Sequence, residues 1–351
     1  MQEFFPTLLS ITLSALKNHI PRIDVQNLSP NGCSLWVANA TKLALTPTTI
    51  ALGKFDGIHL GHQQVIQPIL QQQYGEITDK SYSTVVTFDP HPRQFFSGQP
   101  HDLLTPLKEK LEQLRSLGVQ QLVLLPFDKE LSAVTPTEFV EKILIRQLKA
   151  VQISVGKDFR FGCRRLGTAE DLQVIAARYG VPVHIVPLAG NGKNTPISTT
   201  LIREALNQGD IPKANQLLGR KYTLVGTILE GEKLGRTLGF PTANLDLPPD
   251  KFLPKQGVYA VSVSTLRKKE DVLKSDTWGV MNIGIRPTVN GTQVSVEVHL
   301  LDWSGDLYGE KLVIKMEKFL RSEQKFESLA ALTNQIRCDC DTARNFFHHG
   351  C

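Results

Sequence analysis

The first half of the sequence alternates between short apolar runs and amphipathic segments. The apolar runs are rich in Val, Ile and Leu, which predicts strands that are buried on both faces. Between them apolar residues recur at helical spacing, and two of these segments begin after a Thr that can cap a helix. The predicted strands are Thr48–Gly53, Tyr82–Phe88, Gln121–Phe127, Val151–Gly156 and Val181–Pro187, and the predicted helices are Gly61–Gln73, Thr105–Leu117, Pro136–Leu148 and Thr168–Tyr179. This alternation predicts an α/β domain with a parallel sheet.

The second half changes to a period of two, which is typical of a small antiparallel sheet or barrel. The predicted strands are Tyr222–Leu229, Val258–Ser264, Trp278–Ile283, Gln293–Leu301 and Leu312–Phe319, with Gly and Asn-Gly in the turns. A final amphipathic helix at about Ser328–Phe347 is expected to pack on this sheet. We therefore expect a disordered N-terminal extension at 1–35, a first domain at 36–209, a linker at 210–219 and a second domain at 220–351.

Composition narrows the class of protein. The chain has 351 residues, of which 41% are hydrophobic, so each domain can bury a core. Its formal net charge of +5 suits an anionic small molecule as well as nucleic acid. We see no apolar run of ~18 residues and expect no membrane span. The five scattered cysteines favour reduced thiols and a cytoplasmic location.

The most informative stretch runs from Ile50 to His62, where an apolar strand passes through a glycine-rich loop into a helix. Such a loop is a common place for an α/β sheet to hold a nucleotide phosphate. His59 and His62 are three residues apart and share one face of the first helical turn. Two imidazoles there can donate hydrogen bonds to a departing pyrophosphate. The alternative is a pair of surface histidines in a loop.

Three further loops follow predicted strands and should meet at the same edge of the sheet. They span Thr87–Arg93, Val155–Gly162 and Pro196–Arg203. Aromatic residues and prolines in the first two suit an apolar slot for a flat ring. In the third, Ser198 or Thr199 can cap a helix whose free N–H groups would face an anion. Each loop alone could be a simple turn with a cap, but together they favour a binding site.

Two stretches of the second half carry candidate chemistry. The rigid loop Gly235–Asn244 presents Thr242 and Asn244, two neutral oxygen ligands suited to Mg²⁺ that stays bound to ATP phosphates. On the strand Gln293–Leu300, the valines share one face and Glu297 lies on the other. A carboxylate on a stiff strand is well placed to act as a general base. The alternative for Glu297 is an ordinary residue facing solvent.

Taken together, these motifs resemble the bacterial bifunctional riboflavin kinase/FAD synthetase family, over roughly residues 40–344. The first half resembles its FMN adenylyltransferase module, and the second half resembles its riboflavin kinase module. The matching motifs, in the order of the family, are Gly53–His62, Thr87–Pro92, Val155–Gly162, Gly235–Asn244, Gly279–Thr288 and Glu297–Asp302, closed by Leu320–Phe326. The resemblance implies a Rossmann-like nucleotidylyltransferase sheet followed by a small antiparallel β-barrel with a C-terminal helix.

The resemblance also implies two reactions with ATP and Mg²⁺: riboflavin to FMN in the second module, and FMN to FAD with release of pyrophosphate in the first. It makes Glu297, His59 and His62 the catalytic residues. The implied substrate- and ATP-binding residues are Gly53, Phe55, Asp56, Gly57, Asp89, Asp158, Phe159, Ser198, Thr199, Thr200, Arg203, Gly235, Arg236, Gly239, Pro241, Thr242, Asn244 and Arg321. One position departs from the family: Leu201 stands where the family usually has Arg, which puts one phosphate contact in doubt.

Two other functions compete with this interpretation. An adenylyltransferase for another acceptor, with an inert barrel, would not turn over riboflavin. An RNA-binding barrel would need aromatic residues interleaved with Lys and Arg, and we find no such basic stripe beside Tyr259, Trp278 or Trp303. The expected partners are therefore riboflavin, FMN, FAD and ATP, with no nucleic acid, membrane or obligate protein partner.

Overall fold

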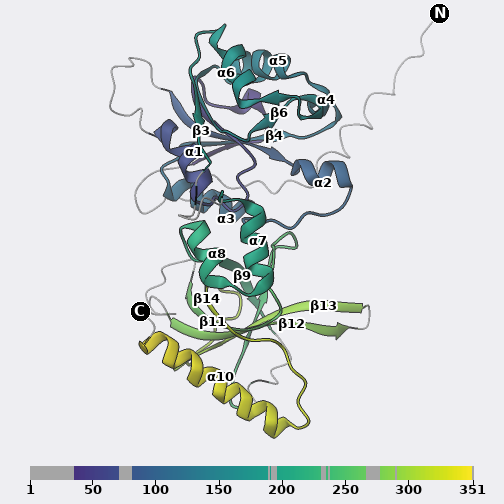
Figure 1. Cartoon of the computed structure of the whole chain (residues 1–351). Helices are drawn as coiled ribbons and strands as arrows, with labels where there is room; N and C mark the ends of the chain where they lie inside the picture. Colours follow the sequence, from purple (N-terminus) through teal and green to yellow (C-terminus); the bar gives the residue numbers. More distant parts are fainter. Residues whose placement is uncertain are drawn as a thin grey trace, which may run out of the picture.

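The computed structural model describes residues 35–70, 81–188, 190, 196–230, 235, 238–265, 277–288 and 291–349. The expected extension at 1–35 lies outside these residues, apart from its last position. The described residues form a parallel sheet in the first half and a closed antiparallel barrel in the second, with two short helices between them (Figure 1). The α/β fold class and the barrel are thus both confirmed.

The parallel sheet has six strands in the order β1-β4-β3-β2-β5-β8. Five of them match the predicted strands, and the edge strand β1 adds a sixth beside β4. Their bounds are β1 Trp36–Ala38, β2 Thr48–Leu52, β3 Tyr82–Asp89, β4 Gln121–Pro126, β5 Ala150–Gly156 and β8 Val183–Val186. Every pairing in the sheet is parallel, so the carboxyl ends of all strands meet at one edge.

Helices cover both faces of this sheet and close two separate cores. One core joins the sheet to α1 and α3, and the other joins it to the long helical turn after α5 and to α6. The helices are α1 Leu60–Leu70, α2 Pro92–Ser97, α3 Leu107–Ser116, α4 Lys129–Ala133, α5 Pro136–Glu138 continued by the π-helix Phe139–Gln147, and α6 Ala169–Ala177. Short 3₁₀ turns at Thr41–Leu43 and Cys163–Arg165 and the small hairpin β6 Arg160–Phe161 with β7 Gly167–Thr168 complete this half.

The barrel closes in the order β10-β13-β12-β11-β14-β9. The strands are β9 Thr223–Leu229, β10 Ala243–Asp246, β11 Gly257–Thr265, β12 Thr277–Thr288, β13 Gly291–Leu300 and β14 Lys311–Arg321. Alternate residues of each strand fill the interior, among them Val296, Val298 and Leu300. The predicted final helix is α10, Leu329–His349, which packs on the outside of the barrel beside β11 and β12 (Figure 1).

Helices α7 Thr199–Gln208 and α8 Ile211–Leu218 lie between the parallel sheet and the barrel (Figure 1). Their apolar side chains do not form a core of their own. Ile211, Leu217 and Leu218 are buried in the same cluster as the barrel interior. The segment expected as a linker is therefore a helix packed into the second core, and the domain boundaries remain a prediction.

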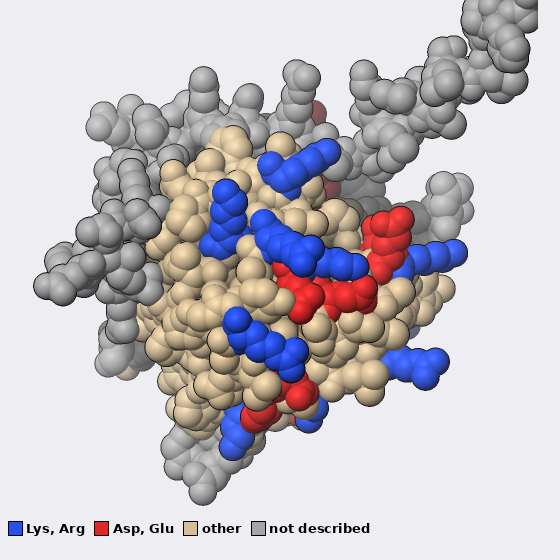
Figure 2. All heavy atoms as spheres, turned by 90° about the horizontal axis from the view of Figure 1, so that it is seen from above, with Lys and Arg blue, Asp and Glu red and all other residues tan. Residues whose placement is uncertain are grey.

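Charged side chains of both signs are interspersed on the face seen from above the parallel sheet (Figure 2). Groups of Lys and Arg there are separated by Asp, Glu and uncharged surface, so the described residues of this face do not form a single basic stripe. Among the residues that the structure describes, no helix is both long and apolar enough to cross a membrane.

Candidate functional sites

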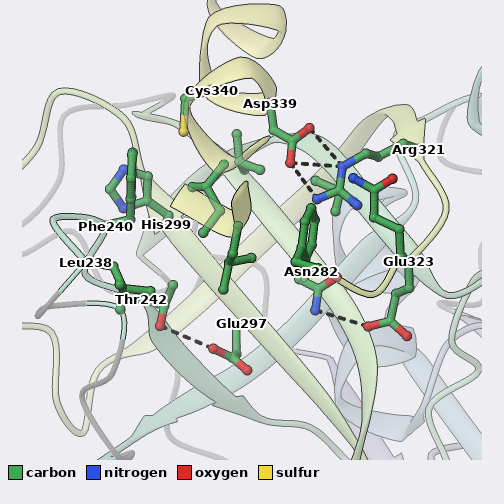
Figure 3. A pocket seen from close by; sticks show the side chains of 17 residues that line it. Leu238, Phe240, Thr242, Asn282, Glu297, His299, Arg321, Glu323, Asp339 and Cys340 are labelled. Atoms are coloured by element: carbon green, nitrogen blue, oxygen red, sulfur yellow. Dashed lines mark hydrogen bonds and ion pairs between the residues drawn. The ribbon is translucent and has the colours of Figure 1, made fainter. Parts of the chain in front are cut away.

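A cavity of about 360 Å³ opens between the outer face of the barrel and α10 (Figure 3). Its volume suits a small-molecule ligand. One wall is apolar and includes Phe240, Val258 and Val280 from the barrel side, with Ile336 and Cys340 from α10. Burial raises the pKa of the Cys340 thiol to about 11, so this side chain is a neutral part of the apolar wall.

The polar wall of this cavity is built across three neighbouring strands. Glu297 on β13 lies directly opposite Asn244 on β10 and Asn282 on β12. Directly paired residues point to the same side of a sheet, so the carboxylate is flanked by two amides. The hydroxyl of Thr242 donates a hydrogen bond to Glu297 Oε2 at 3.2 Å. The sequence thus predicted correctly that Glu297 lies off the barrel core, and the structure adds that Thr242 and Asn244 are its neighbours.

Charged residues also tie α10 to the rim of this cavity (Figure 3). Arg321, at the end of β14, donates from Nε and Nη2 to the Asp339 carboxylate, with distances of 2.8–3.1 Å. This two-pronged pair fixes the helix against the barrel at the mouth of the cavity. The Arg321 guanidinium is therefore already engaged, although sequence resemblance predicts it as a ligand-binding residue.

Among the polar lining residues that sequence reasoning did not name as site residues are Asn282, Glu323 and Asp339. Asn282 gave a signal, because it is the one amide in the apolar run of its strand. Asp339 gave none, since its role depends on how α10 packs. Of the predicted residues, Gly235 lines the cavity and Gly239 takes a positive φ of 84°. The carbonyl of Pro241 accepts a hydrogen bond from His299 Nδ1 at 2.8 Å. Arg236 lies outside the described residues.

The second candidate site is the loop from Gly53 to His62, at the carboxyl end of β2. Three of its residues take positive φ angles: Phe55 at 48°, Gly57 at 90° and Ile58 at 42°. Only glycine adopts such angles readily, and a β-branched residue there is unusual. Each strained non-glycine residue costs about 1–3 kcal/mol and is typical of functional sites.

The rings of His59 and His62 stack with their centroids 3.7 Å apart. The backbone N–H of His62 donates to His59 Nδ1 at 3.3 Å, so the proton of a neutral His59 is on Nε2 and can be donated to a ligand. The His62 Nδ1 atom is buried and has no hydrogen-bond partner among the described residues. Burial lowers the pKa of His59 to about 4 and that of His62 well below 6.5, so both rings are neutral at pH 7.

We expect His59 to make the stability of the protein depend on pH. Its folded-state pKa of about 4 lies below the ordinary value of 6.5, so the unfolded chain gains a proton first as the pH falls. The stabilisation is fully present above pH 6.5, and the loss of unfolding free energy between pH 6.5 and pH 4 amounts to about 3 kcal/mol. Urea unfolding of the parent and of His59→Asn at pH 4.5 and 7 measures this. Equal pH dependence in both proteins would contradict the prediction.

Two of the predicted ligand residues form the scaffold of the loop. Asp56, which is 3% exposed, accepts from Arg203 Nη2 at 2.8 Å and from the Thr105 N–H at 3.2 Å. Arg203 also donates to the carbonyl of Asp102 at 2.6 Å. Both groups are therefore paired with protein before any nucleotide arrives.

The helix α7 beside this loop carries three further predicted residues. Ser198 caps it by accepting from the Leu201 N–H, and the Thr199 hydroxyl donates to the carbonyl of Asp56 at 3.2 Å. Thr200 is exposed in the first turn. Leu201 packs against the core shared with the barrel, which accounts for an apolar residue where the family usually has Arg.

Aromatic side chains gather at the ends of the two neighbouring strands β3 and β4. Phe88, Phe95, Phe96 and Phe127 make edge-to-face contacts with centroids 5.3–5.7 Å apart. Phe96 is 70% exposed, so this cluster offers a free ring face. Sequence reasoning expected an aromatic slot from the loops Thr87–Arg93 and Val155–Gly162. Phe88 of the first loop belongs to this cluster, whereas Phe159 of the second loop stacks on Phe161 at 5.7 Å. Asp89 and Asp158 are exposed at the ends of β3 and β5, on the same edge of the sheet.

Comparisons with known proteins match each half of the chain to a family. The FAD synthetase family profile matches residues 41–201, and the riboflavin kinase family profile matches residues 218–347. The chain is 38% identical over 299 residues to the bifunctional riboflavin kinase/FMN adenylyltransferase of Escherichia coli K12, covering 85% of this chain and 92% of that protein. The protein of the same description from Bacillus subtilis is 36% identical over 308 residues, covering 86% and 92%.

A crystal structure described as a macrolide-efflux protein from Streptococcus pneumoniae has the same overall fold. Its TM-score is 0.76 at 30% sequence identity, and the match covers 89% of this chain and 99% of that one. The order of the two family matches is also the order of the two candidate sites, with the histidine loop in the first and Glu297 in the second. The chain belongs to the bifunctional riboflavin kinase/FMN adenylyltransferase family.

Proposed function

We propose that the cavity beside Glu297 is the riboflavin kinase site and that the His59–His62 loop is the FMN adenylyltransferase site. The enzyme phosphorylates riboflavin to FMN with ATP in its second half and adenylylates FMN to FAD in its first half, as its family membership implies. The observation that supports the kinase assignment best is the row Asn244, Glu297, Asn282 with the Thr242 hydroxyl at its end.

In the kinase site, Glu297 accepts the proton of the riboflavin 5′-hydroxyl. The resulting oxygen nucleophile attacks the γ-phosphorus of ATP, the bond to the β-phosphate oxygen breaks, and ADP leaves. Because little covalent chemistry is required of the protein, positioning and charge neutralisation supply most of the catalysis. The apolar wall around Val258 and Val280 orients the flat flavin ring, and the strands hold the carboxylate still.

Thr242 and Asn244 fit a Mg²⁺ ion that arrives with ATP. Their oxygens are neutral and lie beside the Glu297 carboxylate, a donor set that hard cations accept. When bound, the ion neutralises phosphate charge. The described residues contain no group of three or more His, Cys, Asp or Glu side chains arranged for a metal. A Mg²⁺ ion held largely by phosphates and waters does not require such a group.

In the adenylyltransferase site, the FMN phosphate is already an anion and requires no general base. One of its oxygens attacks the α-phosphorus of ATP, the bond between the α- and β-phosphates breaks, and pyrophosphate leaves. Neutral His59 donates from Nε2 to the departing pyrophosphate, and His62 assists from the stacked position. The exposed face of Phe96 offers a stacking surface for the isoalloxazine ring of FMN.

Riboflavin, FMN, FAD and ATP are then the partners, and the remaining predicted residues contact them: Gly53, Phe55, Gly57, Asp89, Asp158 and Phe159 in the first site, and Gly235, Arg236, Gly239 and Pro241 in the second. We propose a cytoplasmic location with no nucleic acid, membrane or obligate protein partner. The direct test incubates the protein with riboflavin, ATP and Mg²⁺ and separates the flavins by chromatography. FMN and FAD should both form, and supplied FMN should give FAD alone.

The kinase half should work as a fragment only when it retains α7 and α8. A fragment of residues 196–351 should fold and phosphorylate riboflavin without making FAD. A fragment of residues 219–351 loses Ile211, Leu217 and Leu218, which are buried in the barrel core. Each large aliphatic side chain contributes about 1.5–3 kcal/mol on burial, so the shorter fragment should be less stable by at least about 3 kcal/mol. Urea unfolding and kinase assays of both fragments test this, and equal stability would contradict it.

A further inference from the structure

The loop that carries His59 and His62 is held by hydrogen bonds to the backbone N–H and the carbonyl of Gly57. The backbone N–H of Gly57 donates to the Thr105 hydroxyl at 2.8 Å, and its carbonyl accepts from Arg220 Nη2 at 2.7 Å. Phe55 and Ile58, on either side of Gly57, are the non-glycine residues of the loop with positive φ. Since His59 follows directly, the grip on Gly57 sets the position of the stacked imidazoles.

Arg220 does not belong to the parallel-sheet half. It follows α8 and leads into the first barrel strand, and the riboflavin kinase match begins at residue 218. The residues before it also press on the loop. Gln63 on α1 donates to the carbonyl of Leu218 at 3.3 Å, and a Cβ on Gly219 would collide with Leu60. The start of the kinase half is therefore packed directly against the histidine loop and α1.

The other support of Gly57 is also fixed by the barrel half. Leu103 makes two backbone hydrogen bonds to the segment 250–252. Its N–H donates to the carbonyl of Asp250 at 2.6 Å, and its carbonyl accepts from the N–H of Phe252 at 2.9 Å. Lys251, between these barrel residues, donates to the carbonyl of Leu104 at 2.8 Å. The segment that carries Thr105 is thus hydrogen-bonded to residues 250–252 of the barrel half.

A buried ion pair adds a further contact between the segment 250–252 and the parallel-sheet half. Lys251 Nζ lies 2.6 Å from Glu109 Oε2 on α3, and the two side chains are only 1% and 5% exposed. Two atoms of the same cluster, Glu109 Oε1 and Arg220 Nε, are buried without a hydrogen-bond partner among the described residues. A buried pair of this kind is weak evidence for stability but is suited to fixing one geometry.

We infer that the kinase half supplies positioning residues for FAD formation: Arg220 and Lys251 hold the Phe55–Ile58 loop, and with it His59 and His62, in the geometry that adenylyl transfer requires. Neither residue is among the described residues that line the kinase cavity. The two halves are then coupled in one direction, because the adenylyltransferase site is incomplete without the barrel half. This inference rests on the proposed role of the histidine pair.

The test compares three full-length variants with the parent. Arg220→Met removes the donor to Gly57 while keeping an apolar stem. Lys221→Met is the matched control, because the neighbouring Lys221 side chain is 49% exposed and pairs with Glu317 on the barrel. Glu109→Gln combined with Lys251→Met removes both charges of the buried Lys251–Glu109 pair, so that neither charge is left buried and unpaired. FAD formation from supplied FMN and FMN formation from riboflavin are measured on the same preparations.

A displacement of about 1 Å at a reacting group can cost about 100-fold in rate. We expect Arg220→Met to lower kcat for FAD formation about 10- to 100-fold, with KM for FMN within about threefold of the parent and riboflavin phosphorylation unchanged. The double variant should likewise lose kcat for FAD formation while keeping riboflavin phosphorylation, and Lys221→Met should match the parent in both activities. Should Arg220→Met not fold, the double variant decides the question alone.

Two results would overturn the inference. One is a kcat for FAD formation within twofold of the parent in a folded Arg220→Met or double variant. The other is an equal loss of both activities, which would show a general structural role. A loss of FAD formation in Arg220→Met but not in His62→Ala would retain the positioning role and refute the histidine assignment. A loss of FAD formation in His62→Ala but not in Arg220→Met would refute only the positioning role.

Discussion

Glu297→Gln should lower the rate of riboflavin phosphorylation by about 10²–10⁴, the usual contribution of a positioned general base. The substitution keeps the size of the side chain and leaves an oxygen that can still accept from the Thr242 hydroxyl. It removes only the ability to take the proton of the riboflavin 5′-hydroxyl. Because the residue lies off the barrel core, the free energy of unfolding should change by less than about 0.5 kcal/mol.

The second half of this experiment is FAD formation from supplied FMN, measured on the same preparation. That reaction takes place in the other half of the chain and should stay within about twofold of the parent rate. Ser295→Ala is a matched control, because Ser295 lies two residues earlier on the same outward face of the strand and is not among the described residues that line the cavity. A kinase rate within a few-fold of the parent would refute Glu297 as the base, and a joint loss of both activities would indicate misfolding.

The periodic parts of the fold were predictable from sequence, and the exceptions have a common physical cause. Ala243–Asp246 and Trp36–Ala38 are short strands without a clear alternation of apolar and polar residues. Ala243–Asp246 forms β10 because strands on both sides of it supply hydrogen bonds, and one of them, β13, is distant in sequence. Its pairing closes the barrel and brings Asn244 opposite Glu297, which no local pattern indicates.

The candidate site shows the same limit. The alternation of valines placed Glu297 off the core, but Asn282 is a neighbour only through the register of two strands. Conversely, Asp56 and Arg203 stand in a motif that implies ligand contacts, whereas the structure pairs them with each other. A motif identifies residues that a family needs, and it does not distinguish those that touch the ligand from those that hold the loop.

The contribution of the barrel half to the histidine loop was also hidden from sequence. Lys251 and Arg220 occur in segments with no recognisable chemistry, 142 and 163 residues from their respective partners Glu109 and Gly57. The expectation of two domains joined by a linker followed from the separate apolar patterns of the halves. The structure shows that α7, α8 and the 250–252 segment join them through buried polar and apolar contacts.

His62→Ala should lower FAD formation from FMN by about 10²–10³, the typical effect of removing one donor to a developing charge. The same enzyme should continue to phosphorylate riboflavin, so that FMN accumulates when riboflavin, ATP and Mg²⁺ are supplied. The stacked partner His59 remains after the substitution, and its Nε2 proton is fixed by the bond from the residue-62 backbone N–H, which alanine retains. The measured loss therefore reports on the second imidazole alone.

The pH profile of FAD formation separates a neutral donor from a cationic one. Burial lowers the pKa of both imidazoles, so the free enzyme carries neutral rings throughout the range from pH 6 to 8. The rate should be flat there with respect to these groups, whereas an imidazolium donor of ordinary pKa would give a rate that falls as the pH rises through about 6.5. Unchanged FAD formation in His62→Ala would show that this ring only packs in the loop. A rate that declines above pH 6.5 in the parent, and not in the variant, would show instead that a charged histidine stabilises the pyrophosphate.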